Sequence, residues 1–256
     1  MSFDLCQHFS QYFSLELAHN NALRDEVYRI RYEVYCEELQ YESPANFPDG
    51  LEKDSYDDHS IHYLLKHKST GNYAGCVRMI MPCNKDKQLM FPWQEFSSSV
   101  ISPYSASQWI QVGEISRLAV RGQFRKRKED GELPIGSILP DNSRKRRFPL
   151  ITMSLYWVAA CLALHLELEL IAIMQPRLAR HLKKCGLRYY SVSDLFEFHG
   201  KRAMFLIKPP ELIENLEPDT YKFFDYVNRL VANDLRQYGS VLPIFEAGLE
   251  TQLSLI

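Results

Sequence analysis

The chain has 256 residues, of which 46% are hydrophobic and 24% are charged. A chain of this length and composition can bury a full core, so disorder is not its default state. The formal net charge of −2 argues against the molecule-wide positive field of a nonspecific nucleic-acid binder. Any docking by charge therefore needs a local patch.

The cysteines and the apolar stretches indicate the cellular compartment in which the protein is expected. Six cysteines occur without a CxxC pair or a cluster at zinc-ligand spacing, which favours reduced thiols and no metal site. The N-terminal segment carries Asp4 and lacks a basic start before an apolar block, so it does not predict a secretory signal. The most apolar stretch, Leu150–Leu164, is shorter than the roughly 18 residues of a membrane span. We expect a cytoplasmic protein without a transmembrane segment.

Periodicity predicts the elements of the first half of the chain. Apolar residues recur at helical spacing from Leu23 to Leu39, which predicts an amphipathic helix, and a loop rich in Pro, Asp and Tyr follows over residues 41–60. Two β-rich runs around a turn then predict a hairpin, and a longer run predicts another strand. These segments are His62–Lys68, the turn Ser69–Asn72, 74–82 and 109–120.

The second half alternates helices and strands after a basic surface excursion over residues 121–148. The expected elements are a helix over 149–168, a buried strand over 170–176, a helix over 177–186, strands over 191–198 and 202–208, and a helix over 219–238. Such an order is α/β with a mixed sheet, and it resembles the GNAT fold. The GNAT fold implies a mostly antiparallel central sheet, flanking helices and a splay between the fourth and fifth strands. We expect one domain over 1–210, with 121–148 as an insertion and 211–256 as a C-terminal helical extension packed on it.

Charged residues interrupt apolar patterns in the predicted helix and in the loop after it. Arg31 and Tyr35 are four residues apart and share a helix face. Asp54 and Asp57 lie three apart in the loop and can orient an ammonium or a guanidinium group. A calcium site is a rival interpretation, although the EF-hand spacing is absent, and a solvated acidic loop is a third.

Two predicted strands also carry charges. Arg78 lies in the middle of an apolar strand, where an unpaired guanidinium is costly, so it needs a carboxylate partner or a cleft. Glu114 and Arg117 interrupt another strand. Residues three apart in a regular strand point to opposite faces, so both reach one site only if a β-bulge intervenes.

Taken as a set, these charges and two tyrosines resemble a known family. Their order and spacing are similar to those of acyl-homoserine-lactone synthases and N-acyl amino acid synthases, over about residues 24–208. The blocks RYEVYCEE, FPDGLEKDSYDDHS and GEISRLAV look most similar to acyltransferases associated with the PEP-CTERM/exosortase system. Tyr35 and Tyr41 stand where the lactone synthases carry Phe and Trp. A clean Gly-rich loop after the central strand is missing, which favours a carrier-protein donor over coenzyme A.

The resemblance implies transfer of a fatty acyl group from acyl carrier protein, or acyl-CoA, to an amino acid or related small amine, without a permanently bound cofactor. It makes Glu114 the general base, with three arginines paired to Asp54, Asp57 and Glu114. The implied catalytic set is Arg31, Asp54, Asp57, Arg78, Glu114 and Arg117. The implied substrate-binding set is Tyr35, Tyr41, Ser116, Leu118 and Val120. The acyl chain is expected among the Leu-rich helix and the strand that ends at Met174.

The basic excursion suggests a docking surface. Residues 121–147 hold nine Lys or Arg against four acidic residues. Because acyl carrier proteins are strongly acidic, a basic patch near the thioester entrance would orient them. The docking candidates are Arg125, Lys126, Arg127, Lys128, Arg144, Lys145, Arg146 and Arg147. A solvated loop is an equal alternative, and RNA binding is a weaker one.

Two other functions fit the same residues. One is an acetyl-CoA-dependent N-acetyltransferase on the same fold. The other is a catalytically silent module that binds acyl carrier protein. Thioester consumption, and the chain length of the acyl group consumed, distinguish the three.

Overall fold

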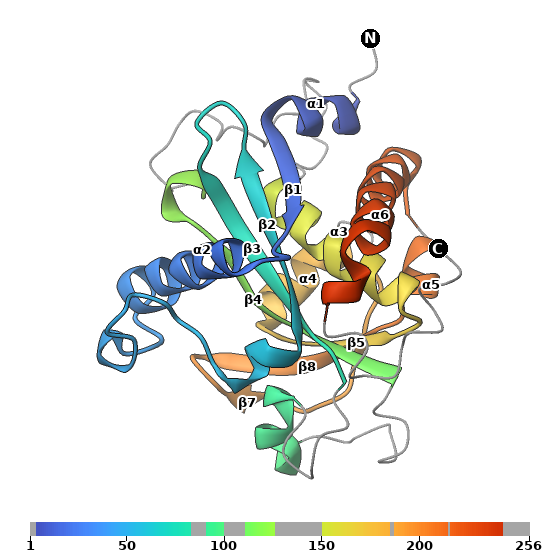
Figure 1. The fold of residues 1–256 in the computed structure, drawn as a ribbon. Coiled ribbons are helices and arrows are strands. Elements are labelled where there is room, and N and C mark those ends of the chain that lie inside the picture. Colours follow the sequence, from blue (N-terminus) through green and yellow to red (C-terminus); the bar gives the residue numbers. More distant parts are fainter. Residues whose placement is uncertain are drawn as a thin grey trace, which may run out of the picture.

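The computed structural model describes residues 4–82, 91–99, 111–125, 150–184, 187–214 and 216–242. Within them, one sheet has the strand order β1-β2-β3-β4-β5-β8-β6, with β7 paired to β8 (Figure 1). The strands are β1 Phe13–Leu17, β2 Ser60–His67, β3 Tyr73–Ile80, β4 Val112–Val120, β5 Glu169–Met174, β6 Tyr190–Ser191, β7 Phe196–Glu197 and β8 Lys201–Ile207. Among the strands that the structure describes, β4 and β5 pair in parallel and all other pairs are antiparallel. The expected mixed, mostly antiparallel sheet is confirmed.

Helices lie on both sides of this sheet. They are α1 Leu5–Tyr12, α2 Asn21–Arg31, α3 Leu150–His165, α4 Pro176–Lys184, α5 Pro209–Ile213 and α6 Pro218–Tyr238. A π-helical segment, η1 Tyr32–Glu38, continues α2, and short 3-10 turns are η2 Pro44–Asn46, η3 Ser55–His59, η4 Pro92–Ser99, η6 Gly122–Phe124 and η7 Gly239–Val241.

Strand alternation assigns the helices to two faces. Leu64 packs with Val27 and Ile30 of α2, whereas its neighbours Tyr63 and Leu65 belong to the larger core that contains α1, α3 and α6. Successive strand residues point to opposite faces, so α2 covers one face and α3 with α6 the other. The charged residues described below lie on the α2 face or beside the gap in the sheet.

The C-terminal helix α6 is part of this core. Phe224 of α6 lies edge-on to Trp157 of α3, with ring centroids 5.4 Å apart, and Phe223 lies edge-on to Phe9 of α1 at 5.2 Å. The Tyr63 hydroxyl also donates to Asp234 of α6 at 3.0 Å. Residues 218–238 therefore share the hydrophobic core of the preceding segments.

Most predicted elements are present, with three differences. The helix expected from Leu23 to Leu39 becomes a π-helix over Tyr32–Glu38. At the end of this segment, the amide of Leu39 donates to the carbonyl of Val34, five residues back. The strand expected over 191–198 is reduced to the short β6 and β7. Finally, α1 and β1 add a helix and an edge strand before α2, which the patterns used above do not predict.

Several negative findings apply to the described ranges. No helix in them is both long enough and apolar enough to traverse a lipid bilayer. No three His, Cys, Asp or Glu side chains in these ranges group closely enough to hold a metal ion. The described cysteines are free thiols at positions 6, 36, 76 and 161.

Candidate active site

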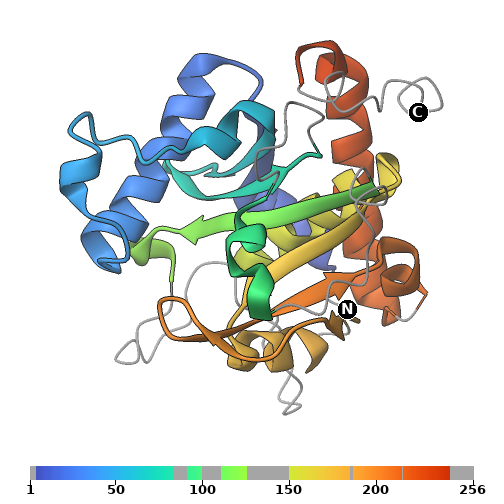
Figure 2. The same cartoon turned by 90° about the horizontal axis from the view of Figure 1, so that it is seen from below.

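The parallel strands β4 and β5 pair only over their first residues. Val112–Ile115 pair with Glu169–Ala172, whereas β4 continues to Val120. Figure 2 shows the two strands close together at one end and diverging toward the other. A cavity of about 260 Å³ lies in this gap, lined by β4 residues 114–118 and by β5 residues 172–174. The splay expected between the fourth and fifth strands is therefore present, and it contains the cavity.

A β-bulge in β4 changes which side chains face this gap. Cys76 of β3 pairs with Ala119, and Arg78 pairs with Ser116, so two steps along β3 match three steps along β4. The extra residue is accommodated at Arg117, whose φ of +47° lies in the left-handed region. Glu114 and Arg117 consequently both line the cavity. The bulge that their spacing requires is confirmed.

Arg31 is fully buried at the end of α2 and is neutralised by two carboxylates. Its Nε donates to Glu52, and its Nη1 donates to Oδ1 of Asp57 at 2.6 Å. Glu52 and Asp57 are themselves 1% and 3% exposed. Because a buried charge is tolerated only when it is paired and hydrogen-bonded, these three residues depend on one another.

Arg78 joins β3 and β4 to the same carboxylates. Its Nη1 donates to Asp54 at 2.6 Å and to Asp57 at 2.9 Å, while its Nε donates to the hydroxyl of Ser116 at 2.9 Å. The acidic loop is shaped to receive it, because Asp54 and Asp57 form a reciprocal capping box at the start of η3. Asp54 is 26% exposed and closes the network toward solvent.

Arg117 connects the network to the cavity. Its Nε donates to Glu52 at 3.1 Å and its Nη2 donates to Glu42 at 3.4 Å. The guanidinium carbon lies 5.5 Å from the ring centre of Tyr35, whose hydroxyl donates to the carbonyl of Leu118 at 2.9 Å. The charge of Arg117 is therefore balanced by the protein itself.

The arginines beside Asp57 have a clear electrostatic consequence. Burial alone would raise the pKa of Asp57, but the guanidinium groups of Arg31 and Arg78 hold it well below its usual range. His62 lies 3.5 Å from the same carboxylate, and burial lowers the pKa of this imidazole to about 3. His62 is therefore neutral, and the network carries its positive charge on arginine.

Glu114 differs from the other carboxylates in the site. It is 2% exposed, and one of its oxygens accepts the backbone N–H of Trp93 at 3.4 Å. Among the residues that the structure describes, it has no ion pair with an arginine; Glu52 occupies the place in the network expected for Glu114. Burial raises its pKa to about 8, against the opposing effect of Arg78 and the Trp93 amide. A carboxyl group with this pKa can exchange a proton near neutral pH.

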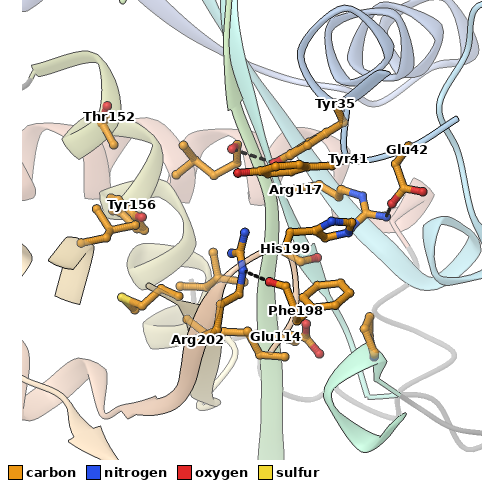
Figure 3. Close-up of a pocket in the computed structure, with 18 residues that line it drawn as sticks. Tyr35, Tyr41, Glu42, Glu114, Arg117, Thr152, Tyr156, Phe198, His199 and Arg202 are labelled. Carbon is orange, nitrogen blue, oxygen red and sulfur yellow. Dashed lines mark hydrogen bonds and ion pairs between the residues drawn. The ribbon is translucent and has the colours of Figure 1, made fainter. Parts of the chain in front are cut away.

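The cavity has an apolar end and a polar end. Figure 3 shows Thr152 and Tyr156 of α3 on one side of β4, and Glu42, Arg117 and His199 on the other. Met174 and Leu178 line the cavity and pack in the same hydrophobic cluster as Tyr156, at the apolar end, whereas Tyr41 stacks on His199 at the polar end. A ligand with an apolar chain and a polar head would therefore have a defined direction in this cavity.

Two further cavity residues, His199 and Arg202, come from the turn between β7 and β8 and from the start of β8. The ring of His199 stacks on that of Tyr41, with centroids 4.7 Å apart and planes inclined by 16°. Nε of Arg202 donates to the carbonyl of Phe198 at 2.6 Å, and its guanidinium lies over the Phe198 ring (Figure 3). The turn thus brings His199, stacked on Tyr41, to the polar end, and β8 brings the cation of Arg202 into the cavity.

The structure brings together most of the residues singled out in the sequence. All six residues of the implied catalytic set share the network or the adjoining cavity, and four of the five implied substrate-binding residues line the cavity. The exception is Val120, which is 8% exposed and packs in the large hydrophobic core.

The docking candidates are described only in part. Residues 126–128 and 144–147 lie outside the described ranges. Arg125 forms an ion pair with Glu38, and the nearby Arg121 pairs with Glu33 at 2.6 Å and with Glu26 at 3.1 Å. These two arginines are therefore used in part to tie the end of β4 to α2 and η1.

Sequence reasoning missed Glu42, Glu52, His62 and Arg202. Glu52 lies two residues before Asp54 in the acidic loop, so matching the three arginines with the carboxylates of this loop could have found it. No pattern distinguished Arg202 from an ordinary charged residue of an outer strand.

The sheet order, the splay and the bulge define a GNAT-type fold. In sequence, residues 30–131 match the model of a family described as Acetyltransferase (GNAT) domain. The acyl-homoserine-lactone synthase of Vibrio anguillarum is 32% identical over 92 residues, which are 36% of this chain and 44% of that protein. That of Aeromonas hydrophila is 28% identical over 109 residues, 43% of this chain and 49% of the relative. The chain thus matches about half the length of these relatives.

Solved structures give the same fold over more of the chain. The acyl-homoserine-lactone synthase LasI superposes with a TM-score of 0.56 at 15% identity, covering 80% of this chain and 97% of LasI. FeeM, an N-acyl amino acid synthase from uncultured soil microbes, gives 0.54 at 13% identity, covering 82% and 97%. The CoA-dependent synthase BjaI, solved with SAM and isopentyl-CoA, gives 0.54 at 17%, covering 84% and 89%. The chain therefore has a fold similar to that of acyl-homoserine-lactone synthases, and residues 30–131 are similar in sequence to the GNAT domain model.

Proposed function

We propose that this protein is an N-acyltransferase that moves a fatty acyl group from a carrier-linked thioester to the amine of an amino acid or related small amine. The observation that carries the proposal is the place of Glu114: a buried carboxyl group, unpaired with arginine within the described residues, beside a cavity in the gap between β4 and β5. The similarity to acyl-homoserine-lactone synthases supports the same reaction class.

The gap suits the donor. Beyond Ile115, β4 no longer pairs with β5, so an extended pantetheine arm can hydrogen-bond there as an added strand. A backbone N–H of β4 would polarise the thioester carbonyl and stabilise the developing oxyanion. The acyl chain would then enter the apolar end, against Met174 and Leu178.

The polar end suits the acceptor. Its amine must lose a proton before or during attack, and Glu114 takes that proton directly or through one water. The nitrogen bonds to the thioester carbon, the C–S bond breaks, and the sulfur leaves as a thiolate that is then protonated. Arg31, Arg78 and Arg117 are positioning residues in this scheme, because they hold the acidic loop and the bulged strand together.

For the donor we favour acyl carrier protein over acyl-CoA. The support is the basic composition of residues 121–147, with Lys126–Lys128 and Arg144–Arg147 as the docking groups. The similarity of the motif blocks to acyltransferases of the PEP-CTERM/exosortase system suggests that the product serves that system, with synthesis in the cytoplasm.

This function is tested by combining different thioester donors with different amine acceptors. The purified protein is incubated with a mixture of the amino acids and with one donor at a time. The donors are acetyl-CoA, acyl-CoA with C8 to C18 chains, and acyl carrier protein with the same chains. Release of free thiol and the mass of the N-acyl product are both measured. The proposal expects thiol release with long-chain donors and one dominant product. Consumption of acetyl-CoA alone would make the protein an acetyltransferase. Carrier-protein binding without thiol release would make it a silent binding module.

A further inference from the structure

The cavity contains one cation whose charge the described residues do not balance. Of its two arginines, Arg117 is paired with Glu42 and Glu52. Arg202 donates through Nε to the carbonyl of Phe198, and within the described part of the chain its two terminal nitrogens form no hydrogen bond or ion pair. Since a partly buried guanidinium binds anions most strongly through a planar pair of N–H donors, its free edge is available to a ligand.

The cavity carboxylates do not serve as partners for Arg202. Glu42 is engaged by Arg117, and Glu114 accepts the Trp93 amide. Figure 3 shows the guanidinium of Arg202 directed into the cavity, between the α3 side chains and the polar end. The hydrogen bond to Phe198 and the contact with its ring, 5.7 Å from the guanidinium carbon, fix this direction before any ligand arrives.

We propose that Arg202 binds the carboxylate of the acceptor and thereby selects α-amino acids over simple amines. This rests on the proposed function. The α-ammonium and the carboxylate of an amino acid are separated by one carbon atom, so a single small molecule can present its amine to Glu114 and its carboxylate to Arg202. An acceptor without the carboxylate leaves the guanidinium unpaired in the cavity, which disfavours its binding.

Two paired measurements test this role. In the first, the best amino acid acceptor and its carboxamide are compared in steady-state kinetics with wild type, Arg202→Gln and Arg202→Lys. We expect Arg202→Gln to raise KM for the amino acid at least about tenfold, since hydrogen bonds to charged groups are typically worth that factor or more. KM for the carboxamide should not rise, because Arg202→Gln removes the unpaired guanidinium that disfavours this acceptor. KM for the thioester, which Arg202 does not hold in this scheme, should change less than about twofold. Arg202→Lys should be intermediate, because it keeps the charge but loses the planar pair of donors.

The second measurement needs no turnover. Binding of N-decanoylglycine and its carboxamide is measured by titration calorimetry, and Arg202→Gln should weaken only the acid. Arg229→Gln is the matched control, because Arg229 lies on α6 with a side chain 75% exposed. Equal weakening of acid and amide, unchanged affinity for both, or a rise in the thioester KM alone would overturn the role of Arg202. Absence of thiol release with every donor would overturn the proposed function, while the calorimetry would still decide the carboxylate site.

Discussion

Arg31 donates to the Oδ1 atom of Asp57 at 2.6 Å, although 26 positions separate them, and Arg78 donates to that same oxygen at 2.9 Å. One carboxylate oxygen thus ties together α2, the acidic loop and β3. Its negative charge lies between two guanidinium groups in a region that excludes solvent. The loop of residues 41–60 has little regular structure, and this oxygen is one of the points that hold it against the sheet.

Removing Arg31 should strongly destabilise the fold. Arg31→Met leaves Asp57 and Glu52 buried with less positive charge, and breaking a buried pair in this way costs about 3–5 kcal/mol. Urea unfolding at pH 7 measures the loss. Arg29→Met on the same helix is the control, because the Arg29 side chain is 52% exposed and forms a surface ion pair with Glu26. It should change the free energy of unfolding by less than about 1 kcal/mol. Equal losses in the two variants would mean that the buried network does not hold the loop.

Replacing Glu114 should reduce turnover. Glu114→Gln keeps the shape of the side chain but cannot take a proton, so we expect kcat to fall at least about tenfold with the circular dichroism spectrum unchanged. Glu197→Gln on β7, whose side chain is exposed, should keep full activity. Wild-type turnover in the Glu114→Gln variant would exclude the base role.

The pH profile should report the same group. Burial raises the pKa of Glu114 to about 8 in the cavity, and the base acts in its ionised form. We therefore expect log kcat/KM of the wild type to rise with pH and level off above about 8. In Glu114→Gln this rise of log kcat/KM with pH should be absent, and any remaining slope should reflect deprotonation of the acceptor amine.

Glu114 should also make stability fall as the pH rises from about 4.5 to 8. Its pKa is raised from 4.5 to about 8 on folding, so its contribution is fully present below about 4.5 and is lost as the pH rises through 8. Compared with the wild type, Glu114→Gln should gain stability between about pH 4.5 and pH 8 and then level off. Thermal unfolding at intervals of half a pH unit measures the gain, and parallel curves for the two proteins would contradict the raised pKa.

His62 should have the opposite effect on stability, which it lowers as the pH becomes acidic. Burial lowers its pKa from 6.5 to about 3, so the stability it contributes is present above 6.5 and is lost as the pH falls toward 3. His62→Gln removes this titration, and its stability should fall less steeply than that of the wild type between pH 6.5 and pH 4. The exposed His181, replaced in the same way, should leave the slope unchanged.

The sequence predicted the parts of the fold in which local signals agree with the tertiary structure. The hairpin β2–β3 has β-rich runs on both sides of a turn, and α3 is apolar around its whole circumference because it is buried on nearly every side. Helix α1 and strand β1 were missed because they are short, and β1 is fixed by pairing with β2, some 50 positions along the chain.

The charged site was predictable only as a set of residue types. A cluster of arginines and acids on apolar elements indicated a network, but which loop carboxylates point inward depends on the path of the loop. Asp57 is buried and the adjacent Asp58 is exposed, and no periodicity separates the two. Arg202 reaches the cavity because the sheet order places β8 beside β5, a long-range arrangement that its neighbours in sequence do not reveal.

The extra residue at Arg117 divides β4 into two halves with opposite phase. Before it, Ile115 faces the α3 side; after it, Val120 faces that side and Ala119 packs against α2. If the same residues paired with β3 without the bulge, Val120 would turn toward α2 and Ala119 toward α3. Val120 would then leave the hydrophobic interior, so the extra residue at this point of the strand is as strictly constrained as the residue types around it.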